Sequence, residues 1–127
     1  MIIILTGQPH SGKTTLAILL KKAIESFSSK NKAYIVDGDD LRKILTNNDY
    51  SESGRRKNVE TAHSIAKYLH SLCEYNYVII SLVSPFRDLR EELKNNFKAK
   101  EFFINTTEIR GREHFHVSNY EAPISNY

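Results

Sequence analysis

Residues 2–15 read IIILTGQPHSGKTT. An apolar, β-branched run comes first, and it is followed by GQPHSGKT, which matches the pattern G-x-x-x-x-G-K-[ST]. From Leu16 to Phe27, apolar residues then recur at three- and four-residue spacings, as on one face of a helix. A strand, a glycine-containing turn and a helix in this order are the context that the motif requires. The stretch therefore predicts a loop that holds the phosphates of a nucleoside triphosphate.

The fixed positions of this loop have physical reasons. Gly7 and Gly12 allow the backbone to fold around phosphates with its N–H groups pointing inward, and the start of the following helix adds partial positive charge. Lys13 can reach the β- and γ-phosphate oxygens, and the Thr14 hydroxyl can bind Mg²⁺. His10 is at a middle position of the loop, where side chains usually face outward. The predicted nucleotide-binding residues are Gly7, Gln8, Pro9, His10, Ser11, Gly12, Lys13, Thr14 and Thr15.

Further apolar runs predict more strands, and their lack of alternation is typical of strands buried on both faces. These runs are Tyr34–Val36, Tyr77–Val83 and Phe102–Ile104. Helical spacing appears from Val59 to Cys73 and again after Pro85 as far as Phe97. Alternating strands and helices with long connections predict a three-layer α/β fold, a parallel sheet flanked by helices. We expect one domain over residues 1–127, with a polar, lid-like segment at about residues 106–120.

Composition limits the possible functions. The 127 residues are 40% hydrophobic and 26% charged, which is typical of a globular chain and excludes a disordered one. A formal net charge of +3 suits a small anionic ligand and does not indicate a nucleic-acid partner. Cys73 is the single cysteine, which excludes an internal disulfide and a multi-cysteine metal site. The first apolar run is too short for a signal peptide or a membrane span, so we expect a cytoplasmic protein without a membrane partner.

Acidic residues follow the second apolar run, in the sequence Asp37-Gly38-Asp39-Asp40-Leu41-Arg42. We expect this strand to lie beside the first one, so that carboxylates at its carboxyl end face the bound nucleotide. Such a carboxylate could hold Mg²⁺ through water or accept the proton of an acceptor hydroxyl. The alternative is that Asp39 or Asp40 caps the start of a helix. We expect one aspartate to cap and at least one to take part in catalysis.

The order of these and later motifs resembles the adenylylsulfate (APS) kinase family, in which a phosphate loop is followed by D-G-D-N-x-R. Tyr50-Ser51-Glu52 resembles the family's G-F-S-E segment, and Arg55-x-x-Asn58 resembles its R-x-E-N. Val83-Ser84-Pro85-Phe86-Arg87 is similar to I-S-P-[YF]-R, and Tyr120-Glu121-Ala122-Pro123 is similar to Y-E-A-P. The resemblance runs from residue 2 to about residue 123.

The resemblance implies a kinase of sulfate assimilation, in which ATP donates its γ-phosphoryl group to the 3′-hydroxyl of adenylylsulfate to give 3′-phosphoadenylylsulfate. It implies that Lys13, Asp37 and Asp39 are catalytic, with Mg²⁺ held by Thr14 and Asp37. Asp39 would orient or deprotonate the acceptor hydroxyl. Ser84 is at the family's phosphoserine position, but direct in-line transfer needs no such intermediate, and a structural Ser-Pro turn is the alternative.

The resemblance also implies an acceptor site and further contacts to ATP. Arginines there would bind the acceptor's anionic group, because a planar guanidinium binds oxyanions through two hydrogen bonds, and Tyr50 would stack on its base. The implied acceptor-binding residues are Asp39, Arg42, Tyr50, Arg55, Asn58, Val83 and Ser84. Arg110 and Arg112, in the lid-like segment, could reach the triphosphate. The family also implies a homodimer.

This chain departs from the family's pattern at several places. Where the family reads E-N-I-R-R, residues 57–61 read KNVET, so Glu60 and Thr61 replace two arginines near the acceptor site. The lid-like segment is shorter than the family's, and family members continue beyond the point of Tyr127 into another strand and helix that help to enclose adenine. These departures leave two alternatives open. One is a related kinase for a different nucleotide conjugate, a modified nucleoside or a polynucleotide end, and the other is a non-catalytic nucleotide-binding regulator.

Overall fold

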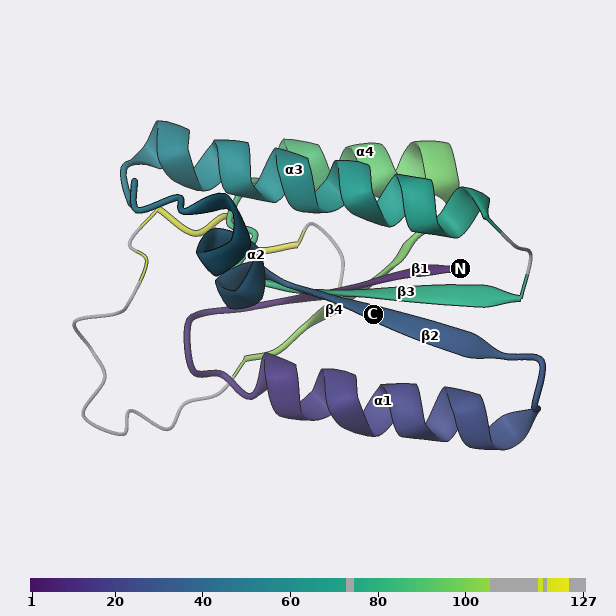
Figure 1. The fold of residues 1–127 in the computed structure, drawn as a ribbon. Coiled ribbons are helices and arrows are strands. Elements are labelled where there is room, and N and C mark those ends of the chain that lie inside the picture. Colours follow the sequence, from purple (N-terminus) through teal and green to yellow (C-terminus); the bar gives the residue numbers. More distant parts are fainter. Residues whose placement is uncertain (73–74, 106–116, 118, 124–127) are drawn as a thin grey trace.

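The computed structural model describes residues 1–72, 75–105, 117 and 119–123. Its elements in chain order are β1 (Ile2–Thr6), α1 (Lys13–Phe27), β2 (Lys32–Asp37), α2 (Gly38–Leu45), α3 (Glu52–Ser71), β3 (Asn76–Ser81), α4 (Arg87–Phe97) and β4 (Lys100–Phe103). The strands form one parallel sheet, with α1 on one face and α3 and α4 on the other (Figure 1). The predicted three-layer α/β fold is confirmed.

The strand order is β2-β3-β1-β4, so the expectation that the second strand lies beside the first is wrong. β3 lies between them, and its register places Leu5, Ser81 and Asp37 in one row across the sheet. β3 takes the central position because its residues are the most consistently apolar after those of β1, and a central strand is buried on both faces. The row matters for function because it brings the ends of β1, β3 and β2 to the same edge.

The core has two parts, one on each face of the sheet. Ile2, Ile4 and Ile80 pack toward α3 and α4, whereas Ile3 and Ile79 pack toward α1. Successive side chains of a strand point to opposite faces, so the uninterrupted apolar run of β1 supplies both parts. Burial on both faces was expected for every strand, but this expectation is wrong for the edge strands: β2 exposes Tyr34, and β4 exposes Phe102 and Phe103.

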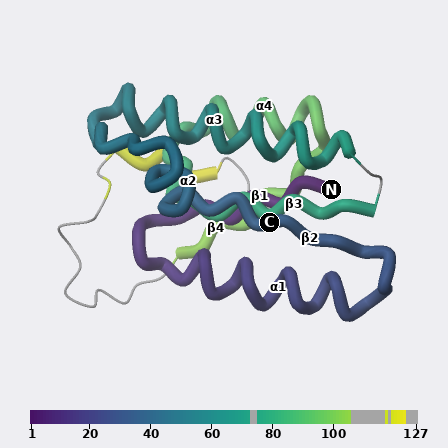
Figure 2. Tube along the Cα trace, viewed as in Figure 1, coloured from purple at the N-terminus to yellow at the C-terminus, as the bar shows by residue number. Residues whose placement is uncertain are grey.

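The sequence explains the start of α3 and the buried face of α1. Ser51 caps α3, because its hydroxyl accepts a hydrogen bond from the Gly54 N–H. In α1 the residues facing the sheet include Ala17, Leu20 and Ile24, and the apolar side chains of Leu16, Leu19 and Phe27 are exposed. Figure 2 shows that the loop after β1, helix α2 and the start of α3 lie at the same end of the sheet. Among the described helices, none combines the length and the apolar character that a membrane span needs.

Candidate functional site

The loop between β1 and α1 has the backbone geometry that phosphate binding needs. Gly12 adopts a left-handed conformation, with φ of 98°. It is the N-cap residue of α1 and, as a glycine, has no side chain that could cap the helix. The first N–H groups of α1 are therefore not occupied by a capping side chain. A Cβ atom at Gly7 would lie 2.5 Å from the carbonyl oxygen of Ile104, so only glycine fits there. Both glycines are thus required by this backbone.

Lys13 is buried inside the loop. Its Nζ atom donates hydrogen bonds to the carbonyl oxygen of Gln8 at 2.8 Å and to Oγ of Ser11 at 3.3 Å. Burial lowers the pKa of Lys13 to about 8, and the negative charges of Asp39 and Asp37 offset part of this effect. The ammonium group is therefore held within the loop, close enough to both carboxylates to be influenced by them.

The carboxylates after β2 are arranged differently from the sequence expectation. Helix α2 begins at Gly38, so its N-cap residue is Asp37, and Asp39 and Asp40 lie in its first turn. The prediction that Asp39 or Asp40 caps the helix is wrong, because the helix has already begun at Gly38, before either residue. Acidic residues in a first turn still favour the helix through its dipole. A Cβ at Gly38 would lie 2.7 Å from Cβ of Leu82, so the start of α2 packs directly against the end of β3.

Asp37 is half-buried at the carboxyl end of its strand. Burial raises the pKa of Asp37 above its ordinary value, and the negative charges of Asp40 and Asp39 raise it further, while Lys13 acts in the opposite direction. The structure thus brings Lys13, Asp37 and Asp39 together, although β1 and β2 are not neighbours. Burial shifts the pKa of two of these groups, Lys13 and Asp37, and such shifts are typical of a binding or catalytic site.

Other predicted nucleotide-binding residues have varied positions. Thr14 and Thr15 are exposed in the first turn of α1, His10 is exposed, and Pro9 is half-buried. Gln8 makes a contact that the sequence did not indicate. Its Nε2 donates to the carbonyl oxygen of Val117 at 3.0 Å, and its Oε1 accepts from the Val117 N–H at 2.8 Å. The Gln8 side chain therefore binds a distant backbone segment.

Arg42 and Tyr50, predicted acceptor-binding residues, organise the connection between α2 and α3. Arg42 donates from Nη1 to the carbonyl oxygens of Asn47 at 3.2 Å and Asp49 at 3.1 Å. The Arg42 guanidinium lies 4.1 Å from the centre of the Tyr50 ring, which is 62% exposed. At Gly54 a Cβ would approach Cγ of Asp49 to 2.3 Å, so this connection packs tightly on α3. Arg42 and Tyr50 form a stacked pair with an aromatic surface open to solvent.

Asn58 and Ser84, also predicted for the acceptor site, are buried without partners. Oδ1 of Asn58 and Oγ of Ser84 have no hydrogen-bond partner among the described residues. Ser84 is completely buried and has φ of 49°, a left-handed conformation that is uncommon for residues other than glycine. Buried polar atoms without partners and strained backbone are costly, and both are typical of functional sites. Arg55 and Val83 are half-buried near them in sequence.

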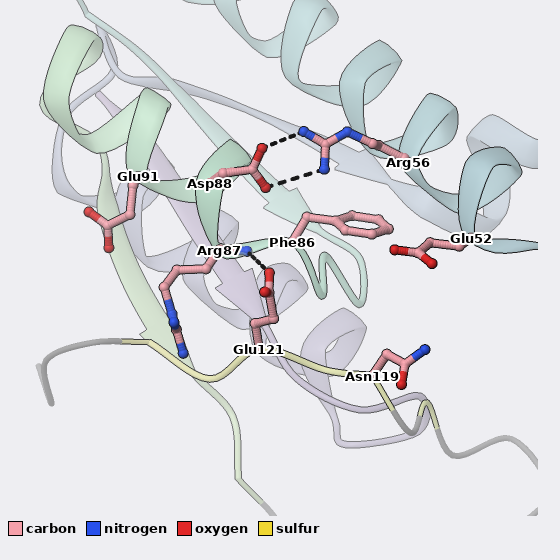
Figure 3. Close-up of a pocket in the computed structure, with 8 residues that line it drawn as sticks. All are labelled: Glu52, Arg56, Phe86, Arg87, Asp88, Glu91, Asn119 and Glu121. Atoms are coloured by element: carbon pink, nitrogen blue, oxygen red, sulfur yellow. Dashed lines mark hydrogen bonds and ion pairs between the residues drawn. The ribbon is translucent and has the colours of Figure 1, made fainter.

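The segment Val83–Arg87, which we call the acceptor loop, is fixed by residues that sequence reasoning missed. Arg90 is fully buried and donates to Oε2 of Glu101 at 2.5 Å, and also to the carbonyl oxygens of Ser84 and Glu121. The Glu121 N–H donates to the Pro85 carbonyl oxygen at 3.0 Å. Glu121 also accepts from the N–H of Arg87 at 2.9 Å (Figure 3). The Y-E-A-P motif signalled Glu121, whereas nothing in the sequence distinguished Arg90 from a solvated helix residue.

A hollow of about 570 Å³ lies between the starts of α3 and α4 and the segment around Glu121 (Figure 3). Its lining residues are Glu52, Arg56, Phe86, Arg87, Asp88, Glu91, Asn119 and Glu121. Arg56 and Asp88 form an ion pair across it. None of the predicted site residues lines this hollow, and carboxylates outnumber guanidinium groups in it. It is therefore separate from the phosphate loop and is poorly matched to an anionic ligand.

Two predictions lie partly or wholly outside the described residues. Arg110 and Arg112 are not among them, nor is most of the lid-like segment at residues 106–120. Among the residues that the structure does describe, no group of three or more His, Cys, Asp or Glu side chains could hold a metal ion by itself.

A parallel sheet in the order β2-β3-β1-β4, with a glycine-containing phosphate loop after β1 and carboxylates after β2, defines a P-loop nucleotide-binding fold. The sequence matches the family model for adenylylsulphate kinase over residues 1–113, and the chain belongs to that family. The resemblance noted from the motifs is confirmed.

Individual relatives agree with this assignment. The adenylyl-sulfate kinase of Pseudomonas aeruginosa is 37% identical over 109 residues, which cover 83% of this chain and 54% of the relative. That of Thermodesulfovibrio yellowstonii is 28% identical over 134 residues, covering 99% of this chain and 65% of the relative. The chain thus spans between half and two thirds of these relatives' lengths.

A solved structure shares the fold. The Mycobacterium tuberculosis APS kinase CysC in complex with AMPPNP and APS superposes with a TM-score of 0.76 at 22% identity, covering 98% of this chain and 84% of that chain.

Proposed function

We propose that this chain is an ATP-dependent kinase that transfers the γ-phosphoryl group of ATP to the 3′-hydroxyl of adenylylsulfate. The observation that carries the proposal is the meeting of Lys13, Asp37 and Asp39 at the mouth of the phosphate loop, in a chain of the adenylylsulphate kinase family. A lysine for the phosphates and carboxylates for the hydroxyl and the metal are the groups that phosphoryl transfer to an alcohol requires.

The donor side rests on the phosphate loop. The N–H groups of the loop and of the first turn of α1 would surround the β- and γ-phosphates, and Lys13 would exchange its hydrogen bonds to Gln8 and Ser11 for phosphate oxygens. These groups neutralise charge that builds up during transfer, which is the main contribution that a protein makes to this reaction.

The residues around Asp37 fit Mg²⁺. The Thr14 hydroxyl is exposed at the start of α1, and the Asp37 carboxylate is crowded by Asp39 and Asp40, a repulsion that a divalent cation would relieve. Mg²⁺ prefers oxygen ligands and is usually held by one or two protein groups together with substrate phosphates, which suits a site without a protein cage. When bound, Mg²⁺ would supply positive charge to the phosphate oxygens.

The acceptor side of the proposal rests on Asn58, Arg55 and Tyr50. The buried Oδ1 of Asn58 would gain a hydrogen bond from the acceptor, recovering about 1–3 kcal/mol that an unpaired buried polar atom costs. Arg55 would bind the acceptor's anionic group, and the exposed ring of Tyr50, held by Arg42, would stack on its base. A relative of this fold has been solved in complex with AMPPNP and APS, which supports adenylylsulfate as the acceptor.

In the proposed reaction the 3′-oxygen attacks the γ-phosphorus, the bond from that phosphorus to the β–γ bridging oxygen breaks, and ADP leaves. The hydroxyl proton passes to Asp39, which is exposed in the first turn of α2. Direct in-line transfer needs no covalent intermediate, so we propose direct transfer without a phosphoserine at the buried Ser84. Ser84 instead shapes the acceptor loop.

The test is mass spectrometry of the products after incubation with ATP, Mg²⁺ and adenylylsulfate, with other nucleotide conjugates and polynucleotide ends offered separately. We expect phosphorylated adenylylsulfate from the wild-type protein and none from Lys13→Ala. A product from a different acceptor alone would keep the kinase and replace its substrate. ATP binding without transfer to any acceptor would overturn the proposal in favour of a nucleotide-binding regulator.

A further inference from the structure

The hydroxyl of Thr6 lies where the phosphate loop and the acceptor loop meet. Thr6 is the last residue of β1, directly before Gly7, and it is completely buried. Its Oγ1 donates to the carbonyl oxygen of Val83 at 2.7 Å, with the carbonyl oxygen of Ser84 at 3.3 Å. A single side chain at the base of one loop therefore holds the backbone of the other.

A second hydroxyl completes the contact from the C-terminal side. The Tyr120 hydroxyl lies 2.5 Å from Oγ1 of Thr6. The Thr6 proton is directed to a carbonyl oxygen, which can only accept, so Tyr120 must donate to Thr6. The Tyr120 ring stacks on Phe103 with 5.5 Å between the ring centres. The Arg90 guanidinium lies 5.4 Å from the centre of the Tyr120 ring.

The segment that carries Tyr120 is itself bound to the acceptor loop. The Glu121 N–H donates to the Pro85 carbonyl oxygen, and the Glu121 carboxylate accepts a hydrogen bond from the Arg87 N–H. Arg90 donates to the carbonyl oxygens of Ser84 and Glu121. The hydroxyl chain from Tyr120 through Thr6 to Val83 is thus one point at which this network reaches the phosphate loop, beside a hydrogen bond from the Gly7 N–H to the Val83 carbonyl oxygen at 3.5 Å. Hydrogen bonds in such a buried, low-dielectric place are strong and fix geometry closely.

We propose that Thr6 is a positioning residue for phosphoryl transfer, and that its hydroxyl, oriented by Tyr120, sets the acceptor loop at the correct distance from the phosphate loop. Thr6 is completely buried, so its side chain would contact neither ATP nor the acceptor. It acts through Gly7 on one side and through Val83 and Ser84 on the other, so it affects the alignment of the two substrates rather than the binding of either. This role rests on the proposed function.

The chain offers a matched pair of variants. Thr6→Val keeps the shape of the side chain and removes the hydroxyl, whereas Thr6→Ser keeps the hydroxyl. We expect Thr6→Val to lower kcat for adenylylsulfate by about 10- to 100-fold, the size of effect that a small misplacement of reacting groups produces. The affinity for a non-hydrolysable ATP analogue should change by less than about threefold, and Thr6→Ser should restore most of kcat.

Two further variants separate positioning from general stability. Tyr120→Phe removes only the outer hydroxyl and should lower kcat in the same direction, by less than Thr6→Val does. Tyr68→Phe, at a tyrosine that is 65% exposed on α3, is the control and should leave kcat unchanged. All activities are measured at a temperature at which each variant is fully folded by circular dichroism. A kcat of Thr6→Val equal to that of the wild type under these conditions would overturn the inference.

Hydrogen exchange tests the same inference without an acceptor. The Glu121 amide, which is bonded to the Pro85 carbonyl oxygen, should exchange faster in Thr6→Val and at the wild-type rate in Thr6→Ser, relative to core amides of β3. Unchanged exchange in Thr6→Val would show that the hydroxyl does not hold the acceptor loop. If the wild-type protein does not phosphorylate adenylylsulfate, the proposed function fails, and hydrogen exchange still decides whether Thr6 joins the two loops.

Discussion

ATP affinity should fall steeply above pH 8, because the empty phosphate loop holds Lys13 where burial lowers its pKa to about 8. The phosphates of ATP favour the ammonium form, so the bound protein keeps the proton to higher pH than the empty protein does. Binding above pH 8 then requires Lys13 to take up a proton. The apparent dissociation constant should rise about tenfold for each pH unit in this range.

The magnitude follows from that single pKa. If only the protonated loop binds ATP, the dissociation constant is multiplied by one plus ten to the power of pH minus 8. Between pH 7.5 and 9.5 this gives about a 25-fold loss of affinity, equivalent to about 2 kcal/mol. Terminal phosphates have already lost their last proton below this range, so the change does not come from the nucleotide.

The assay is a fluorescence titration with an ATP analogue and Mg²⁺ at several pH values. Lys13→Arg is the diagnostic variant, because a guanidinium stays charged throughout and its affinity should be independent of pH. Lys21→Arg, on the same helix, is the matched control and should keep the wild-type slope.

The expected loss of ATP affinity at high pH is not caused by unfolding, because Lys13 affects the two in opposite directions. The pKa of Lys13 is lower in the folded protein than its ordinary value of 10.5, so the unfolded chain binds the proton more tightly between pH 8 and 10.5. The contribution of Lys13 to the free energy of unfolding therefore rises with pH while ATP affinity falls. A wild-type affinity that stays constant from pH 7.5 to 9.5 would refute the idea that Lys13 is buried in the empty loop.

Substitutions at three other residues test the proposed catalytic roles and the pH dependence of stability. Asp39→Asn should lower kcat by about 10³-fold, the order of a lost phosphoryl-transfer group, and near wild-type turnover would remove Asp39 from the mechanism. Ser84→Ala should retain most of the transfer activity in the same assay, and loss of activity with the fold intact would revive a phosphoserine. Burial lowers the pKa of His63 from 6.5 to about 4, so the free energy of unfolding should fall by about 3 kcal/mol as pH drops from 6.5 to 4. Urea denaturation should show a much weaker fall for His63→Gln, whereas His70→Gln, at a half-buried histidine, should keep most of it.

The parts of the fold that depend on residues close together in the sequence could be predicted. The phosphate loop is continuous in sequence, and its glycines, lysine and flanking apolar residues each follow from local physical needs. The same is true of α1, α3 and α4. Their apolar spacing predicts that these helices form, but it does not show which of their apolar side chains stay exposed. Leu16 and Leu19 matched the helical pattern but are exposed, because α1 is the only described helix on its face of the sheet and buries just one stripe.

The parts that depend on distant residues could not be predicted. Strand order is a choice among similar apolar runs, and nothing local to Asp37 indicates that β3 separates its strand from β1. Arg90 and Glu101 read as surface charges on a helix and a strand, yet they pair inside the protein. Gln8 and Val117 meet across most of the chain length through a contact with the backbone, which has no sequence pattern of its own.

The structure also bears on the residues that depart from the family's pattern. Residues two positions apart on a helix point in nearly opposite directions, so Glu60 does not share the face of α3 that carries Asn58. Glu60 is exposed, with Oε1 4.0 Å from Nε of Arg56, which lines the hollow. Thr61 directs its hydroxyl to the Lys57 carbonyl oxygen of its own helix. Glu60 and Thr61 therefore make contacts along α3 itself, and neither supplies a hydrogen bond to Oδ1 of Asn58.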